Sequence, residues 1–119
     1  MRVRQLRDAV TALSVLSFVL PLYAHAILLS ATPAVSQGLK GPNIPVKLEF
    51  NSRIDAKRSR LTLVLPDGEQ RTLEIGLQSS PNCLISAAKG LARGPYVLRW
   101  QVLASDGHIS RGEVPFRID

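Results

Sequence analysis

The chain has 119 residues and a formal net charge of +6, and 5% of its residues are aromatic. This length allows one small domain, and so few aromatic residues beside scattered positive charges exclude an obvious nucleic-acid binder. The single cysteine excludes an internal disulfide, so the fold must rest on its apolar core.

Residues 1–24 have the pattern of a secretory signal peptide. Three arginines form a basic start, an apolar run follows over residues 9–20, and Pro21 ends it. A small residue, Ala24, then stands at the expected cleavage position. We predict an exported protein, and cleavage after Ala24 would make His25 the new amino terminus.

Two alternatives remain open for this segment. Ala24-His25-Ala26 also fits the small-x-small rule, and cleavage after Ala26 removes His25. An uncleaved membrane anchor is the other alternative, but Pro21 interrupts the apolar stretch, which is short for a bilayer span. Cleavage after Ala24 leaves residues 25–119 as one domain with 12 basic and 8 acidic residues, a net charge of +4.

Short alternating apolar runs separated by proline and glycine predict an all-β fold after the signal peptide. We expect a seven-stranded Greek-key β-sandwich of cupredoxin-like or immunoglobulin-like shape. The predicted strands lie at residues 27–31, 46–50, 61–65, 71–75, 83–87, 96–104 and 114–118. Residues 35–45 are predicted as a loop, and Pro66-Asp67-Gly68 as a tight turn.

Three single residues within these strands carry further expectations. Trp100 lies in the longest run and is predicted at the centre of the core. Pro115 faces outward, which suggests an edge position because proline cannot donate to a strand ladder. Cys83 is interpreted as a small buried hydrophobe. The alternative, a thiolate ligand for Cu(I), has no histidine or methionine near it in the sequence.

The only two histidines and one nearby aspartate are candidate metal ligands: His25, Asp106 and His108. Taken alone, Asp106-Gly107 is an ordinary turn signal. Asp106 and His108 are two positions apart, however, so in an extended or bulged segment their side chains can point the same way. The amine and imidazole of an amino-terminal His25 would add a chelating nitrogen pair that a metal readily deprotonates. Three nitrogens and a carboxylate suit Cu(II), but the proximity of residue 25 does not follow from periodicity.

Three stretches of the chain carry a resemblance to a known family: His25-Ala26-x-Leu28-x-Ser30-x-x-Pro33-Ala34, Pro45-x-x-Leu48-x-Phe50, and Leu91-x-x-Gly94-x-Tyr96-x-x-x-Trp100 followed by Ser105-Asp106-Gly107-His108. They resemble the mature start, second strand and carboxy-terminal half of the CopC (CopC/YobA-type) family of periplasmic copper-binding proteins. The last stretch is the most specific.

The resemblance implies a cupredoxin-like sandwich with one Cu(II) per chain, held by the amine and ring of His25, the carboxylate of Asp106 and the ring of His108. It also favours cleavage after Ala24 over cleavage after Ala26, and it implies a periplasmic carrier in copper homeostasis or resistance that hands copper to a CopD-type inner-membrane transporter. Met1 is the only methionine and leaves with the signal peptide, so a methionine-rich Cu(I) site is not expected.

Two other classes compete with a copper carrier. Polysaccharide monooxygenases also hold copper with an amino-terminal histidine, but the 95 residues from 25 to 119 leave little room for a carbohydrate surface. Asp106 would also fill a coordination position that oxygen chemistry needs open, so we do not expect an enzyme. A metal-free immunoglobulin-like module, structural or adhesive, explains the fold and treats both histidines as incidental.

Overall fold

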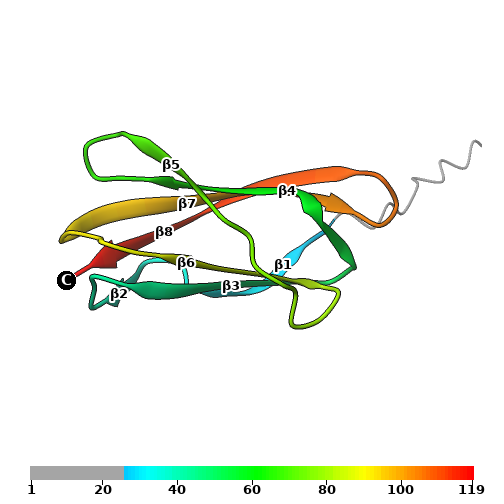
Figure 1. Ribbon diagram of the computed structural model, residues 1–119, viewed down its shortest axis with the longest axis horizontal. Coiled ribbons are helices and arrows are strands. Elements are labelled where there is room, and N and C mark those ends of the chain that lie inside the picture. The colour runs from blue at the N-terminus through cyan, green and yellow to red at the C-terminus, as the bar shows by residue number, and fades with distance from the viewer. Residues whose placement is uncertain (1–25) are drawn as a thin grey trace, which may run out of the picture.

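The computed structural model describes residues 26–119, which form two facing β-sheets (Figure 1). The strands, in chain order, are β1 (Leu28–Thr32), β2 (Gln37–Leu39), β3 (Ile44–Phe50), β4 (Ile54–Val64), β5 (Gln70–Leu73), β6 (Cys83–Ala88), β7 (Gly94–Ala104) and β8 (Ile109–Ile118). The predicted all-β sandwich is confirmed, with eight strands in the described part of the chain instead of the expected seven. The predicted signal peptide and His25 lie outside the described residues.

The smaller sheet has the strand order β1-β3-β6, and the larger sheet has the order β2-β8-β7-β4-β5. Neighbouring strands run antiparallel except for β2 and β8, which are parallel. The chain crosses between the sheets several times, as expected for a Greek-key sandwich. Each sheet therefore has one face turned towards the other sheet.

The core fills the space between the sheets because alternate residues of the long strands point inward. In β3 and β7 every second side chain is buried while its neighbours are partly or fully exposed. Trp100 is 8% exposed, and its ring meets the ring of Phe50 edge to face at a centroid distance of 5.1 Å. A second aromatic pair, Tyr96 and Phe116, stacks at 5.5 Å. The predicted core position of Trp100 is confirmed.

The additional strand, β2, lies inside the segment predicted as a loop. Its three residues pair in parallel with the closing residues of β8, from Phe116 to Ile118. Just before this pairing begins, Ser36 donates its backbone N–H to the carbonyl of Pro115. The prediction of an edge position is therefore wrong for residues 116–118 of β8, which pair with β2. Pro115 itself faces outward and is exposed.

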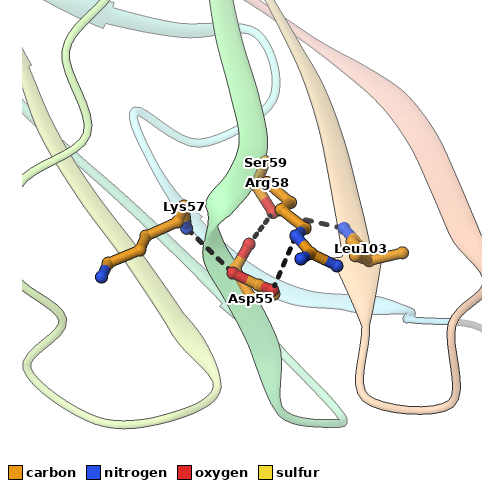
Figure 2. A network of polar contacts seen from close by, with 5 residues as sticks. All are labelled: Asp55, Lys57, Arg58, Ser59 and Leu103. Carbon is orange, nitrogen blue, oxygen red and sulfur yellow. Dashed lines mark hydrogen bonds and ion pairs between the residues drawn. The ribbon is translucent and has the colours of Figure 1, made fainter.

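Strand β4 is longer than predicted and contains a bulge. It pairs with β7 at Asp55, and regular pairing resumes only at Arg60. Across the gap, the Ser59 hydroxyl accepts the backbone N–H of Leu103 at 3.2 Å and donates to the Asp55 carbonyl at 2.7 Å, while the Asp55 carboxylate accepts the N–H of Lys57 (Figure 2). Side chains thus replace ladder bonds, and β4 stays attached to β7 up to the turn that follows β7.

Candidate metal centre

Residues 105–108 connect β7 to β8, and the hydrogen bond between Ala104 and His108 encloses three of them, 105–107. Ala104 donates its N–H to the carbonyl of His108 at 2.9 Å, and Gly107 donates its N–H to the carbonyl of Ala104 at 2.9 Å. Gly107 has φ 88°, in the left-handed region that glycine adopts without a steric cost. This is the arrangement of a three-residue hairpin loop with glycine at the left-handed position.

The turn brings Asp106 and His108 together. One carboxylate oxygen, Oδ1, accepts the backbone N–H of His108 at 3.0 Å, and the other, Oδ2, lies 3.1 Å from Nδ1 of the His108 ring. Both side chains remain partly accessible, with exposures of 30% for Asp106 and 40% for His108. Asp106 and His108 are thus in contact with each other, as their spacing of two residues allows.

The surroundings of the Asp106 carboxylate favour its ionised form. The hydrogen bond from the backbone N–H of His108 lowers the pKa of Asp106 below its usual value, and the His108 side chain adds to the effect. The charged form is favoured because it accepts these bonds. Asp106 is therefore ionised throughout the neutral range and offers a negatively charged oxygen.

The separation of the two ligand atoms fits one metal ion. Nitrogen and oxygen ligands lie about 2 Å from a divalent transition ion, so two ligands at right angles are about 2.8 Å apart. The Oδ2 to Nδ1 distance of 3.1 Å is close to that value. One carboxylate and one imidazole are ligands that Cu(II) accepts in tetragonal geometry, and the pair could hold two adjacent positions around it.

The start of the described chain lies at the same end of the sandwich as this turn (Figure 1). The connection between β3 and β4 is hydrogen-bonded both to the start of the described chain and to this turn. Asn51 donates its N–H to the carbonyl of Ile27 at 3.0 Å and accepts the N–H of Ile27 with its side-chain Oδ1 at 2.7 Å, whereas Ser105 donates its N–H to the carbonyl of Arg53 at 3.1 Å. Ile27, which is close to position 25, and Ser105 of the turn thus both form hydrogen bonds with the short β3–β4 connection.

No cluster of three or more histidine, cysteine, aspartate or glutamate side chains occurs among residues 26–119. Within that range, the Asp106 and His108 pair is the part of the predicted ligand set that the structure brings together. The third member, His25, lies just before the first described residue. The sequence does not point to Asn51 or Arg53, because their contacts join residues far apart in the chain and leave no pattern along it.

Cys83 is buried, with 2% exposure, as the interpretation as a small hydrophobe predicts. Its Sγ lies 3.1 Å from the hydroxyl of Ser80. The described residues also contain no helix long and apolar enough to cross a membrane.

The fold and the site define a class of protein: a small two-sheet β-sandwich that presents an aspartate and a histidine from a hairpin turn at one end. The chain belongs to the CopC family, because the family model described as the CopC domain matches residues 28–119. The resemblance found in the sequence is thereby confirmed.

Solved structures and a curated relative agree with this assignment. The structure of CopC from Methylosinus trichosporium OB3b has a TM-score of 0.72 and 30% identity, covering 80% of this chain and 94% of that one. PcoC, a methionine-rich copper resistance protein from Escherichia coli, shares the fold, with a TM-score of 0.64 at 22% identity over 81% of this chain and all (100%) of that one.

The copper transport protein CutJ of Bacillus subtilis (strain 168) is 24% identical over 99 residues, which are 81% of this chain. The chain spans only 18% of the length of that relative.

Proposed function

We propose that this protein is a periplasmic, non-enzymatic Cu(II) carrier in copper homeostasis or resistance. Removal of residues 1–24 exposes His25, and one Cu(II) per chain is held by the amine and ring of His25, the carboxylate of Asp106 and the ring of His108. Membership of the CopC family supports a copper-related function. The names of the relatives, a copper transport protein and a copper resistance protein, point to the same metal.

The observation that carries the proposal is the pairing of Asp106 with His108 at the end of the sandwich where the described chain begins. Oδ2 and Nδ1 are 3.1 Å apart on a turn braced by backbone hydrogen bonds. A pair of ligands held in place before the metal arrives loses little entropy on binding. The pair supplies one nitrogen and one oxygen, and the proposal adds two further nitrogens from residue 25.

The donor set explains the choice of metal and oxidation state. An α-amine and an imidazole lose their protons to a metal near neutral pH, and Cu(II) leads the divalent series for such ligands. Soft thioether ligands, which favour Cu(I), are almost absent, because the chain has a single methionine. The proposed cargo is therefore Cu(II), and the buried Cys83 takes no part in holding it.

Delivery to a CopD-type inner-membrane transporter is the proposed route for the copper. The curated relative joins a CopC-like stretch to a much longer chain and is called a copper transport protein. A carrier domain and a transporter would then work in sequence, with the domain supplying the ion.

The test is a Cu(II) titration of the exported protein after its amino terminus has been determined by mass spectrometry. We expect His25 at the terminus, saturation at one Cu(II) per chain, and a spectrum with three nitrogen ligands. His108→Ala should remove one of those nitrogens and weaken binding at least about tenfold, a change of about 1.4 kcal/mol. Unchanged binding in that variant would favour the metal-free immunoglobulin-like module instead.

A further inference from the structure

Asn51 holds both backbone groups of Ile27. Its side-chain Oδ1 accepts the N–H of Ile27 at 2.7 Å, and its own N–H donates to the carbonyl of Ile27 at 3.0 Å. Asn51 lies outside β3, just past its last residue, and its side chain is exposed. The backbone bond continues the register of Leu28 with Phe50 by one pair, whereas the side-chain bond is a local arrangement that the sheet ladder does not require.

We propose that Asn51 is a positioning residue for the copper site: by holding Ile27, it keeps residue 25 within reach of Asp106 and His108. The inference rests on the proposed function and adds to it a residue that contacts no metal. Two residues of extended chain span at most about 7 Å. The position of Ile27 therefore limits where the amine and ring of residue 25 can go.

The backbone pairing between β1 and β3 restrains the start of β1 only weakly. Strand β1 is an edge strand, and its register with β3 shifts between Leu28 and Ser30, which leaves Leu29 as an extra residue. A bulge of this kind interrupts the ladder and bends the strand. The Asn51 contact lies on the amino-terminal side of the bulge, where it restrains the chain next to residue 25.

The segment that carries Asn51 is itself anchored on two sides. Towards the hairpin turn, Ser105 donates its N–H to the carbonyl of Arg53 at 3.1 Å. Towards β6, Phe50 donates its backbone N–H to the carbonyl of Asn82 at 2.9 Å. The side-chain amide of Asn82 in turn donates to the carbonyl of Phe50, also at 2.9 Å. The corner between β3 and β4 is therefore a rigid bridge from Ile27 to the turn that carries Asp106 and His108.

The first experiment compares the Cu(II) dissociation constant of the exported protein with that of Asn51→Ala. We expect binding about tenfold weaker, because roughly one residue of backbone must now be ordered when copper binds. Hydrogen exchange of the Ile27 amide should also accelerate in the metal-free protein, since its acceptor is gone. The exposed Asn51 side chain leaves no cavity, so the variant should fold.

Asn43→Ala is the matched control. Asn43 is also exposed, and its Oδ1 accepts the N–H of a distant residue, Gly90, at 3.0 Å. It lies at the opposite end of the sandwich, where β3 begins (Figure 1). This variant loses the same kind of bond and should keep the copper affinity of the original protein. Equal weakening in both variants would overturn the inference.

A double-mutant cycle then asks whether Asn51 acts through residue 25. In a His25→Ala background, Asn51→Ala should weaken copper binding less than it does in the original protein, because the ring of residue 25, one of the two groups that Asn51 positions, is gone. Asn51→Asp keeps the acceptor oxygen, so its Ile27 amide should stay protected and its copper affinity should be no weaker than that of the original protein.

The outcomes separate the two proposals. Loss of binding in His25→Ala and His108→Ala together with full affinity in Asn51→Ala contradicts the positioning role alone. Full affinity in all three variants contradicts the proposed function itself. An Asn51→Asp variant as weak as Asn51→Ala would also refute the role of the acceptor oxygen.

Discussion

The two oxygens of Asp106 have different partners. Oδ1 accepts the backbone N–H of His108 and stabilises the turn, and Oδ2 faces the His108 ring. The first contact is an ordinary turn bond that an uncharged amide could also make. The second presents a negative charge beside an imidazole nitrogen. Substitution at this residue can therefore separate the structural contribution of Asp106 from its proposed contribution to copper binding.

Asp106→Asn should weaken Cu(II) binding at least about tenfold, because the charge is lost, while the turn persists through the remaining carbonyl oxygen. The melting temperature should change by less than about 4 °C, because the turn keeps its hydrogen bond. Competitive Cu(II) titration and thermal unfolding measure the two effects.

Asp67→Asn provides the control for this change. Asp67 accepts the N–H of Glu69 at 2.9 Å in the turn between β4 and β5, with the same spacing of two residues but no histidine. Its copper affinity should equal that of the original protein. A similar loss of affinity in both asparagine variants would contradict a specific role for Asp106.

At the scale of single elements, the β7–β8 hairpin depends on a close approach between Gly112 and Trp100. The two residues pair across the strands, and a Cβ at position 112 would lie 2.3 Å from Cζ2 of the indole. Glycine is thus needed here for the space that it leaves to the Trp100 ring. The Trp100 ring in turn packs on Phe50, so the contact connects the two sheets.

Gly112→Ala should lower the free energy of unfolding by about 1–3 kcal/mol, because the indole must leave its position in a packed core. Denaturant unfolding followed by the fluorescence of the single tryptophan measures this directly. Gly76→Ala is the control, since its Cβ would meet only the carbonyl oxygen of Ile85 at 3.6 Å, an ordinary contact. Equal stability of the two variants would contradict the steric argument.

The bulge in β4 yields another prediction. Ser59→Ala removes the acceptor of the Leu103 N–H, so it should lower the free energy of unfolding by about 1–2 kcal/mol. Ser110→Ala should be neutral, because the Ser110 hydroxyl is buried without a hydrogen-bond partner in the described part of the chain. Chemical denaturation compares the two. A larger loss in the Ser110 variant would refute the bridging role of Ser59.

These elements also show what could be predicted from the sequence. The alternation of Val46, Leu48 and Phe50 predicts β3 because each faces the core. Residues 54–60 were missed because the bulge breaks their alternation, and between Asp55 and Arg60 side-chain bonds replace the ladder pairing with β7. Strand β2 was missed because three residues carry no periodic signal, and its pairing with β8 joins distant parts of the chain.

At the scale of the whole molecule, the sandwich has two distinct ends. One end carries the turn with Asp106 and His108, the β3–β4 connection and the start of the described chain, and the turn that contains Asp67 lies at the other (Figure 1). The Asp106 and His108 pair could be predicted because both residues lie within one short turn. Contacts made by Asn51 and Arg53 could not, because they join residues far apart in the sequence.

In the proposed site, an amino-terminal His25 binds Cu(II) together with Asp106 and His108. The most direct test adds one glycine before His25 and compares the Cu(II) affinity of the two proteins by competition titration. We expect a loss of about a hundredfold, or about 2.7 kcal/mol, because the amine becomes an amide and the chelate ring is lost. Equally tight Cu(II) binding by the extended protein would rule out His25 as an amino-terminal ligand.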